Sequence, residues 1–140
     1  MKNIKIVGIM AVAVAVIVLA IAGIQMGSAP SGKEPVRIGS ILILSGEGSA
    51  WGIAEKNGID MAIEKINAEG GINGRKLVIS HQDDRGDPKT ALSAFESLVD
   101  GSGVHVIIGT TWSRTGLPLA DLADQKKVLM ISPSLGVKEF

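Results

Sequence analysis

VRIGSILILSGEGSAWG, residues 36–52, decides the fold of this 140-residue chain. Its first half is a near-continuous apolar run, which is typical of a strand covered on both faces, as in a parallel sheet between helices. Its second half is mostly glycine, serine and alanine, and it ends near Trp51. Ligands of open α/β sheets bind beyond the carboxyl ends of strands. The loop therefore predicts a binding crevice, and the alternative is a tight turn whose Trp51 only packs on the next helix.

The rest of the chain alternates helical and strand patterns. Apolar residues recur at three- and four-residue spacing over 50–69, which predicts an amphipathic helix that ends at Gly70-Gly71. We expect further strands over 76–81, 104–108 and 128–131, and further helices over 88–100 and 111–125. Asp87-Pro88 is typical of a helix start, and Pro118 fits best in the first turn of the third helix. This order predicts an α/β fold with right-handed βαβ units and a doubly wound parallel sheet.

The N-terminal part of the chain differs in composition from the rest. Two lysines precede an uncharged stretch over 6–31, which is long enough to span a bilayer as a hydrophobic helix. Positive residues before such a stretch favour that end staying inside the cell. We therefore expect a signal peptide or N-terminal membrane anchor over 1–28, a linker over 29–35 and a folded domain over 36–140. The folded domain would then be extracytoplasmic, either periplasmic or at the cell surface.

The composition argues against several classes of function. The chain carries 14 basic and 14 acidic residues, and the part after the apolar stretch carries 12 basic and 14 acidic ones. No basic patch indicates nucleic acid as a partner. The absence of cysteine excludes disulfides, thiolate chemistry and cysteine-ligated metals.

No pattern in the sequence indicates catalysis or a cofactor. Gly46-x-Gly48 is similar to the start of a dinucleotide-binding loop, but Trp51 stands where the third, small residue is needed. His81 and His105 belong to different expected strands and have no shared ligand spacing. No nucleophile–base pair is apparent. We therefore expect a protein that is not an enzyme and that has neither a metal site nor a cofactor.

Five segments, in order and spacing, carry a resemblance to a known family. They are Leu44-Ser45-Gly46 with Trp51-Gly52, NAEGGINGRK at 67–76, Asp83-Asp84 with Asp87-Pro88, Val106-Ile107-Ile108-Gly109, and Ile131-Ser132-Pro133. Together they resemble type I periplasmic ligand-binding proteins, and more narrowly the leucine/isoleucine/valine-binding group that serves ABC importers. The resemblance covers 36–140 and implies one lobe of a two-lobed protein that clamps its ligand between the lobes. We expect an N-terminal fragment or the product of a truncated gene, because the first crossover to a second lobe is not reached.

The resemblance implies four ligand-binding residues. Trp51 would lie beside the ligand, and Ser113 would bind its carboxylate at the start of the third helix, where free N–H groups attract anions. The backbone carbonyl of Ser134 would meet the ligand's ammonium group. Gly136 stands where many amino-acid binders carry a hydroxyl residue, so an amide, a urea-like solute or a carboxylate stays open beside an α-amino acid. The alternatives are a helix cap for Ser113 and an ordinary turn around Ser134.

Other polar and aromatic residues near these positions have two interpretations. Trp112 either narrows the pocket or simply packs, and Arg114 either pairs with an acidic ligand or is a solvated charge. The resemblance makes Asp83 and Asp84 structural features of their loop rather than a metal or acid–base pair. Asp87 is expected to cap the second helix.

The predicted function is therefore the extracytoplasmic solute-binding component of an ABC importer. Its ligand would be a branched-chain or related amino acid, and its partner would be an ABC permease in the membrane. One alternative is the ligand-sensing ectodomain of a membrane-anchored receptor, and another is a binder of an amide, urea or carboxylate. A flavodoxin-like enzyme domain is a third alternative, which the export pattern and the incomplete nucleotide loop oppose.

Overall fold

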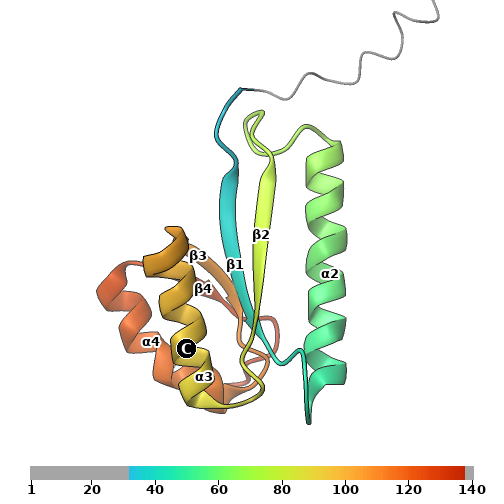
Figure 1. The fold of residues 1–140 in the computed structure, drawn as a ribbon. Helices are drawn as coiled ribbons and strands as arrows, with labels where there is room; N and C mark the ends of the chain where they lie inside the picture. Colours follow the sequence, from blue (N-terminus) through green and yellow to red (C-terminus); the bar gives the residue numbers. More distant parts are fainter. Residues whose placement is uncertain (1–31, 138–140) are drawn as a thin grey trace, which may run out of the picture. The chain divides into compact units, whose positions relative to one another are not determined.

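The structure, a computed structural model, describes residues 32–137 (Figure 1). Its elements are β1 (Val36–Leu42), α2 (Ser49–Ala68), β2 (Leu77–Asp83), α3 (Pro88–Glu96), a π-helical turn (Ser97–Gly101), β3 (Val106–Gly109), α4 (Ser113–Lys126) and β4 (Leu129–Ile131). The predicted signal or anchor over 1–28 lies outside the described residues. Within 32–137, no helix is both long enough and apolar enough to cross a membrane.

The four strands form one parallel sheet in the order β2-β1-β3-β4. Val36 of β1 pairs with Leu77 of β2, while Gly39 of β1 pairs with Ile107 of β3 on the other side. The predicted α/β class and parallel sheet are confirmed. The chain leaves β1 toward β2 and then returns to the opposite side of β1, so the direction of winding changes between β1 and β3. In such sheets this change of direction opens a crevice at the carboxyl ends of the strands.

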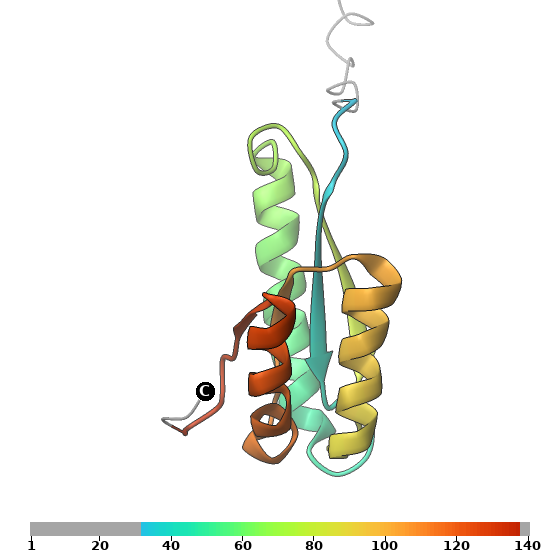
Figure 2. The same cartoon turned by 90° about the vertical axis from the view of Figure 1, so that its left-hand side faces the viewer.

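Helices cover both faces of the sheet, as Figures 1 and 2 show: α2 lies on one face, and α3 and α4 lie on the other. The core fills the space between the sheet and the α3/α4 pair. Its largest fully buried apolar side chains are Phe95, Ile41, Leu98, Ile107 and Leu119. Burial of such side chains supplies most of the driving force for folding.

Helix α2 approaches the end of the first strand very closely at Gly52, its only buried residue. A Cβ atom at Gly52 would lie 2.1 Å from the carbonyl oxygen of Ile43, so no other residue fits there without backbone movement. This contact sets where the first turn of α2 begins. The residue just before it, Trp51, is consequently carried to the edge of the sheet where the strands end.

Two expected helices differ in detail from the structure. The segment expected as one helix over 88–100 is helical, but it changes from α3 to a π-helical turn at Ser97. Pro118 lies in the second turn of α4, so its expected place in the first turn is wrong. The first turn of α4 lies before Pro118 because the carbonyl of Trp112 accepts the N–H groups of Thr115 and Gly116 at 3.1 Å each. Asp87 is confirmed as the cap of α3, because its carboxylate accepts the N–H of Thr90 at 2.8 Å.

Candidate functional site

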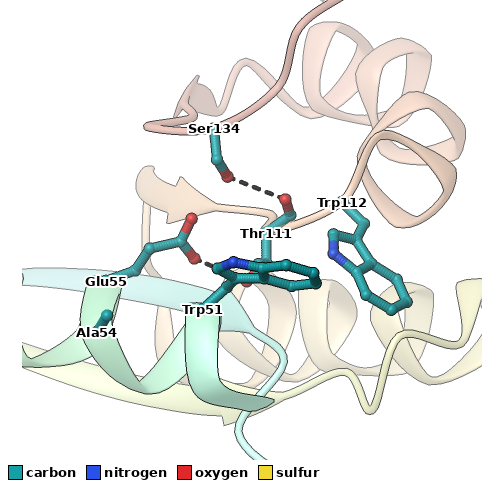
Figure 3. A pocket seen from close by; sticks show the side chains of 6 residues that line it. All are labelled: Trp51, Ala54, Glu55, Thr111, Trp112 and Ser134. Atoms are coloured by element: carbon teal, nitrogen blue, oxygen red, sulfur yellow. Dashed lines mark hydrogen bonds between the residues drawn. The ribbon is translucent and has the colours of Figure 1, made fainter. Parts of the chain in front are cut away.

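A pocket of about 400 Å³ opens where the winding of the sheet changes direction, and this volume is typical of small-molecule sites. Six residues line it, as Figure 3 shows: Trp51, Ala54, Glu55, Thr111, Trp112 and Ser134. They come from the first turns of α2, the loop after β3 and the loop after β4. The crevice predicted from the first strand and its loop is therefore present.

Trp51 stands in the first turn of α2 and leaves 63% of its surface exposed. Its ring centroid lies 6.1 Å from that of Trp112, with the two planes inclined by 59°. A large aromatic side chain that is this exposed inside a pocket offers a face for ligand contact. The exposed face of Trp51 is thus available inside the pocket, and its role in binding a ligand stays a prediction.

Trp112 both lines the pocket and packs against neighbouring loops. Its indole lies beside two glycines: a Cβ atom would be 2.4 Å from the ring at Gly48 and 3.2 Å from it at Gly86. The guanidinium carbon of Arg114 lies 4.3 Å from the centroid of the same ring, which is a cation–π contact. Arg114 thus holds Trp112 and is not among the residues that line the pocket.

Thr111 connects the strand end, the helix and the pocket. The backbone N–H of Ile43 donates to its hydroxyl at 3.1 Å, and the hydroxyl donates its own proton to Oε2 of Glu55 at 2.7 Å. The hydroxyl of Ser134 donates to the carbonyl of Thr111 at 2.9 Å. Because Thr111 is almost fully buried, these bonds hold both Glu55 and Ser134 at the pocket wall.

The four predicted site residues are distributed unequally around the pocket. Trp51 and Ser134 line it, and their contact with a ligand stays a prediction. Ser113 is the first residue of α4 and follows the lining residue Trp112, but it does not line the pocket itself. Gly136 is exposed and also lies outside the lining.

Sequence reasoning missed Glu55 and Thr111 as parts of the site. Glu55 is four residues after Trp51 on the same helix, and residues at this spacing share a helix face, so the spacing carried a signal. The sequence places Thr111 only at the start of the helix expected over 111–125. Its role depends on the approach of Ile43 from another strand, for which the local sequence holds no signal.

Asp83 and Asp84 serve the loops around the pocket. Burial raises the pKa of Asp83, but hydrogen bonds from the Ser45 hydroxyl and from backbone N–H groups outweigh it and hold this pKa below its usual value. Burial raises the pKa of Asp84, whose Oδ1 accepts the N–H of Gly86 at 2.8 Å. The carboxylate of Asp83 therefore joins its loop to the segment after the first strand, and the carboxylate of Asp84 holds the turn within its own loop.

Comparisons with known proteins all point to the same family. The model of the periplasmic binding protein family matches residues 35–139. A Leu/Ile/Val-binding protein, BraC3 of Rhizobium johnstonii, is 37% identical over 110 residues, which are 79% of this chain and 30% of the relative. The leucine-specific-binding protein of Salmonella typhimurium is 37% identical over 100 residues, 71% of this chain and 27% of the relative.

A solved structure shows the same fold. The branched-chain amino acid transporter substrate-binding protein LivJ of Streptococcus pneumoniae, in complex with isoleucine, matches with a TM-score of 0.71 and 31% identity over 74% of this chain and 30% of that one. The chain thus spans about 30% of the length of the curated relatives it matches first. With a family model matched over most of its length and these relatives beside it, the chain belongs to the periplasmic binding protein family.

Proposed function

We propose that this chain contributes the first lobe of an extracytoplasmic solute-binding protein that delivers a branched-chain or related amino acid to an ABC permease. The observation that carries the proposal is the pocket at the carboxyl ends of the strands, lined by Trp51 and Ser134. Relatives named as Leu/Ile/Val-binding and leucine-specific-binding proteins support the ligand class. The chain itself acts by binding and not by catalysis.

The pocket has the chemistry that such a ligand needs. The indole of Trp51 and the nearby ring of Trp112 offer apolar contact for an aliphatic side chain. We expect the free backbone N–H groups at the start of α4, at Ser113, to stabilise the ligand's carboxylate, with Ser113 next to the lining residue Trp112. Ser134 and Gly136 would complete the polar end from the loop after β4. A second lobe would close over the open side and exclude water from the ligand.

A thermal-shift experiment tests this function. The sample is the full-length soluble protein, by which we mean the protein extended past Phe140 and without its first 32 residues. Leucine, isoleucine and valine are compared with an amide, urea and a small carboxylate. A ligand that binds only the native state adds about 2.7 kcal/mol of stability at 100 times its Kd, so we expect one of the aliphatic amino acids to raise the Tm by several degrees.

Two variants make this experiment specific to the pocket. Trp51→Ala removes one wall, so the shift should disappear. Met61→Ala truncates another exposed apolar side chain of α2, which is 70% exposed and lies outside the pocket lining, so the shift should persist. If leucine, isoleucine and valine all leave the Tm unchanged, the proposal that the ligand is a branched-chain amino acid is wrong. If both variants keep the full shift, the ligand binds elsewhere.

A further inference from the structure

The ring of Trp112, which lines the pocket in Figure 3, fills a notch between two loops. A Cβ atom at Gly48, in the loop after β1, would lie 2.4 Å from its Cζ2 atom. A Cβ atom at Gly86, in the loop after β2, would lie 3.2 Å from its Cζ3 atom. Trp112 itself ends the loop after β3, so this one side chain joins the loops that follow three neighbouring strands.

The backbone of Trp112 is fixed from below by two threonines. Its carbonyl accepts the hydroxyl proton of Thr110 at 2.8 Å and that of Thr115 at 2.9 Å. The same carbonyl accepts the first N–H groups of α4. Both threonine side chains are fully buried, and buried polar groups with satisfied hydrogen bonds are rigid. The direction in which the indole leaves the backbone is therefore set by the fold.

Arg114 holds the ring from the side of α4. Its guanidinium carbon lies 4.3 Å from the ring centroid, and its Nη2 atom would lie 2.8 Å from a Cβ atom at Gly86. The cation and the ring therefore rest against the same glycine. Arg114 is exposed and lies outside the pocket lining, and within residues 32–137 none of the ion pairs includes it. Since indole faces attract cations, the ring is the partner that orders this guanidinium.

We propose that Arg114 is a positioning residue for ligand binding, which acts through the ring of Trp112 and does not touch the ligand. This inference rests on the proposed function, because the ring is part of the wall of the same pocket. While Arg114 holds the ring in its notch, the three loops keep one arrangement before a ligand arrives. Without Arg114 the ring can leave the notch, and the ligand must then order it on binding, which lowers the affinity.

A double-mutant cycle tests this inference with the full-length soluble protein. Isothermal titration uses whichever of leucine, isoleucine and valine binds the wild type most tightly. Ordering one side chain on binding lowers the affinity by about 2- to 10-fold, so we expect a loss of this size in Arg114→Ala. Arg114→Lys keeps a cation beside the ring and should bind more tightly than Arg114→Ala. In a Trp112→Leu background Arg114→Ala should have no further effect, because no ring is left to hold.

A spectroscopic signal reports the position of the ring itself. The protein is labelled with 5-fluorotryptophan, and the fluorine resonance of Trp112 is identified by its absence from Trp112→Phe. In ligand-free Arg114→Ala this resonance should shift or broaden, and saturating ligand should return it to the wild-type position. This measurement and the lysine variant decide the question even if Trp112→Leu does not fold.

A control and three outcomes separate this role from general effects. Arg37→Ala removes another exposed arginine, on β1 and outside the pocket lining, and should change neither the affinity nor the resonance. If the wild type binds its ligand and Arg114→Ala alters neither quantity, the inference is wrong while the proposed function stands. The same holds if Arg114→Ala weakens binding equally with and without the Trp112 ring, because Arg114 would then act on the ligand directly. If the wild type binds none of the three amino acids, both fail.

Discussion

Replacing Gly48 with alanine tests the packing of the pocket wall most directly. Gly48 has a φ of +88°, and its added Cβ would lie 2.4 Å from Cζ2 of Trp112 and 3.0 Å from Cη2. The left-handed backbone alone costs an alanine about 1–2 kcal/mol. Forcing the methyl group against a ring that Gly86 and Arg114 hold from elsewhere adds an overpacking cost of about 1–3 kcal/mol. We therefore expect Gly48→Ala to lower the free energy of unfolding by about 2–5 kcal/mol.

The same loop provides a matched control. Gly46 also has a positive φ, +77°, but nothing lies within 4 Å of a Cβ placed there. Gly46→Ala should therefore show the backbone cost alone, about 1–2 kcal/mol. The difference between the two variants isolates the contact with Trp112. Urea unfolding of the full-length soluble protein at fixed temperature gives both values from the midpoint and the slope.

Tryptophan fluorescence adds a local measurement to the unfolding data. In a Trp51→Phe background Trp112 is the remaining tryptophan of these 140 residues, which hold two. Gly48→Ala should then change the emission of Trp112, whereas Gly46→Ala should not. Equal destabilisation by the two alanines, together with unchanged emission, would refute the reasoning, because it would show that Trp112 does not rest against Gly48.

Three further predictions follow from single side chains, each checked by urea unfolding. Phe95→Ala removes a fully buried ring and should cost about 3–5 kcal/mol. Thr111→Val leaves the N–H of Ile43 without its acceptor and should cost about 1–3 kcal/mol, whereas Thr111→Ser should restore most of this loss. Burial raises the pKa of Asp84 above 3.8, so the native protein binds a proton at this carboxyl more tightly than the unfolded chain does. The contribution of Asp84 to stability therefore falls as the pH rises above 3.8 and through the raised pKa. Between about pH 4 and pH 7, the stability of Asp84→Asn should therefore rise relative to wild type, and a constant difference would contradict this.

The features that the sequence predicted are those that depend on neighbouring residues. The apolar run before the first loop gave a strand, and Asp87-Pro88 gave a helix start, because a cap and a fixed φ act within one turn. The prediction that Pro118 lies in the first turn of α4 was wrong, because the start of this helix depends on hydrogen bonds to the Trp112 carbonyl rather than on proline alone. Local rules describe how an element can begin, and tertiary contacts decide which residue begins it.

The candidate site was predicted in part for the same reason. Trp51 stands at the far end of the loop after the first strand, so the rule that ligands bind beyond strand ends indicated it, whereas the family resemblance indicated Ser134. Thr111 became visible only with the order of the strands, since its hydroxyl joins Ile43 from the end of one strand to Glu55 on a helix. A residue whose partners come from two other elements has no signature in its own neighbours.

Glu55 shows how closely the fold and the wall of the pocket are linked in this lobe. Its carboxylate is positioned by one hydroxyl, and that hydroxyl is positioned by a backbone N–H at the end of the buried first strand. A change in the spacing between the first and third strands would therefore move the charge that the pocket presents. Sites supported by strand ends and helix starts are rigid. For this reason, substitutions beneath the pocket, such as Thr111→Val, should weaken ligand binding even though the exposed face of Trp51 is left intact.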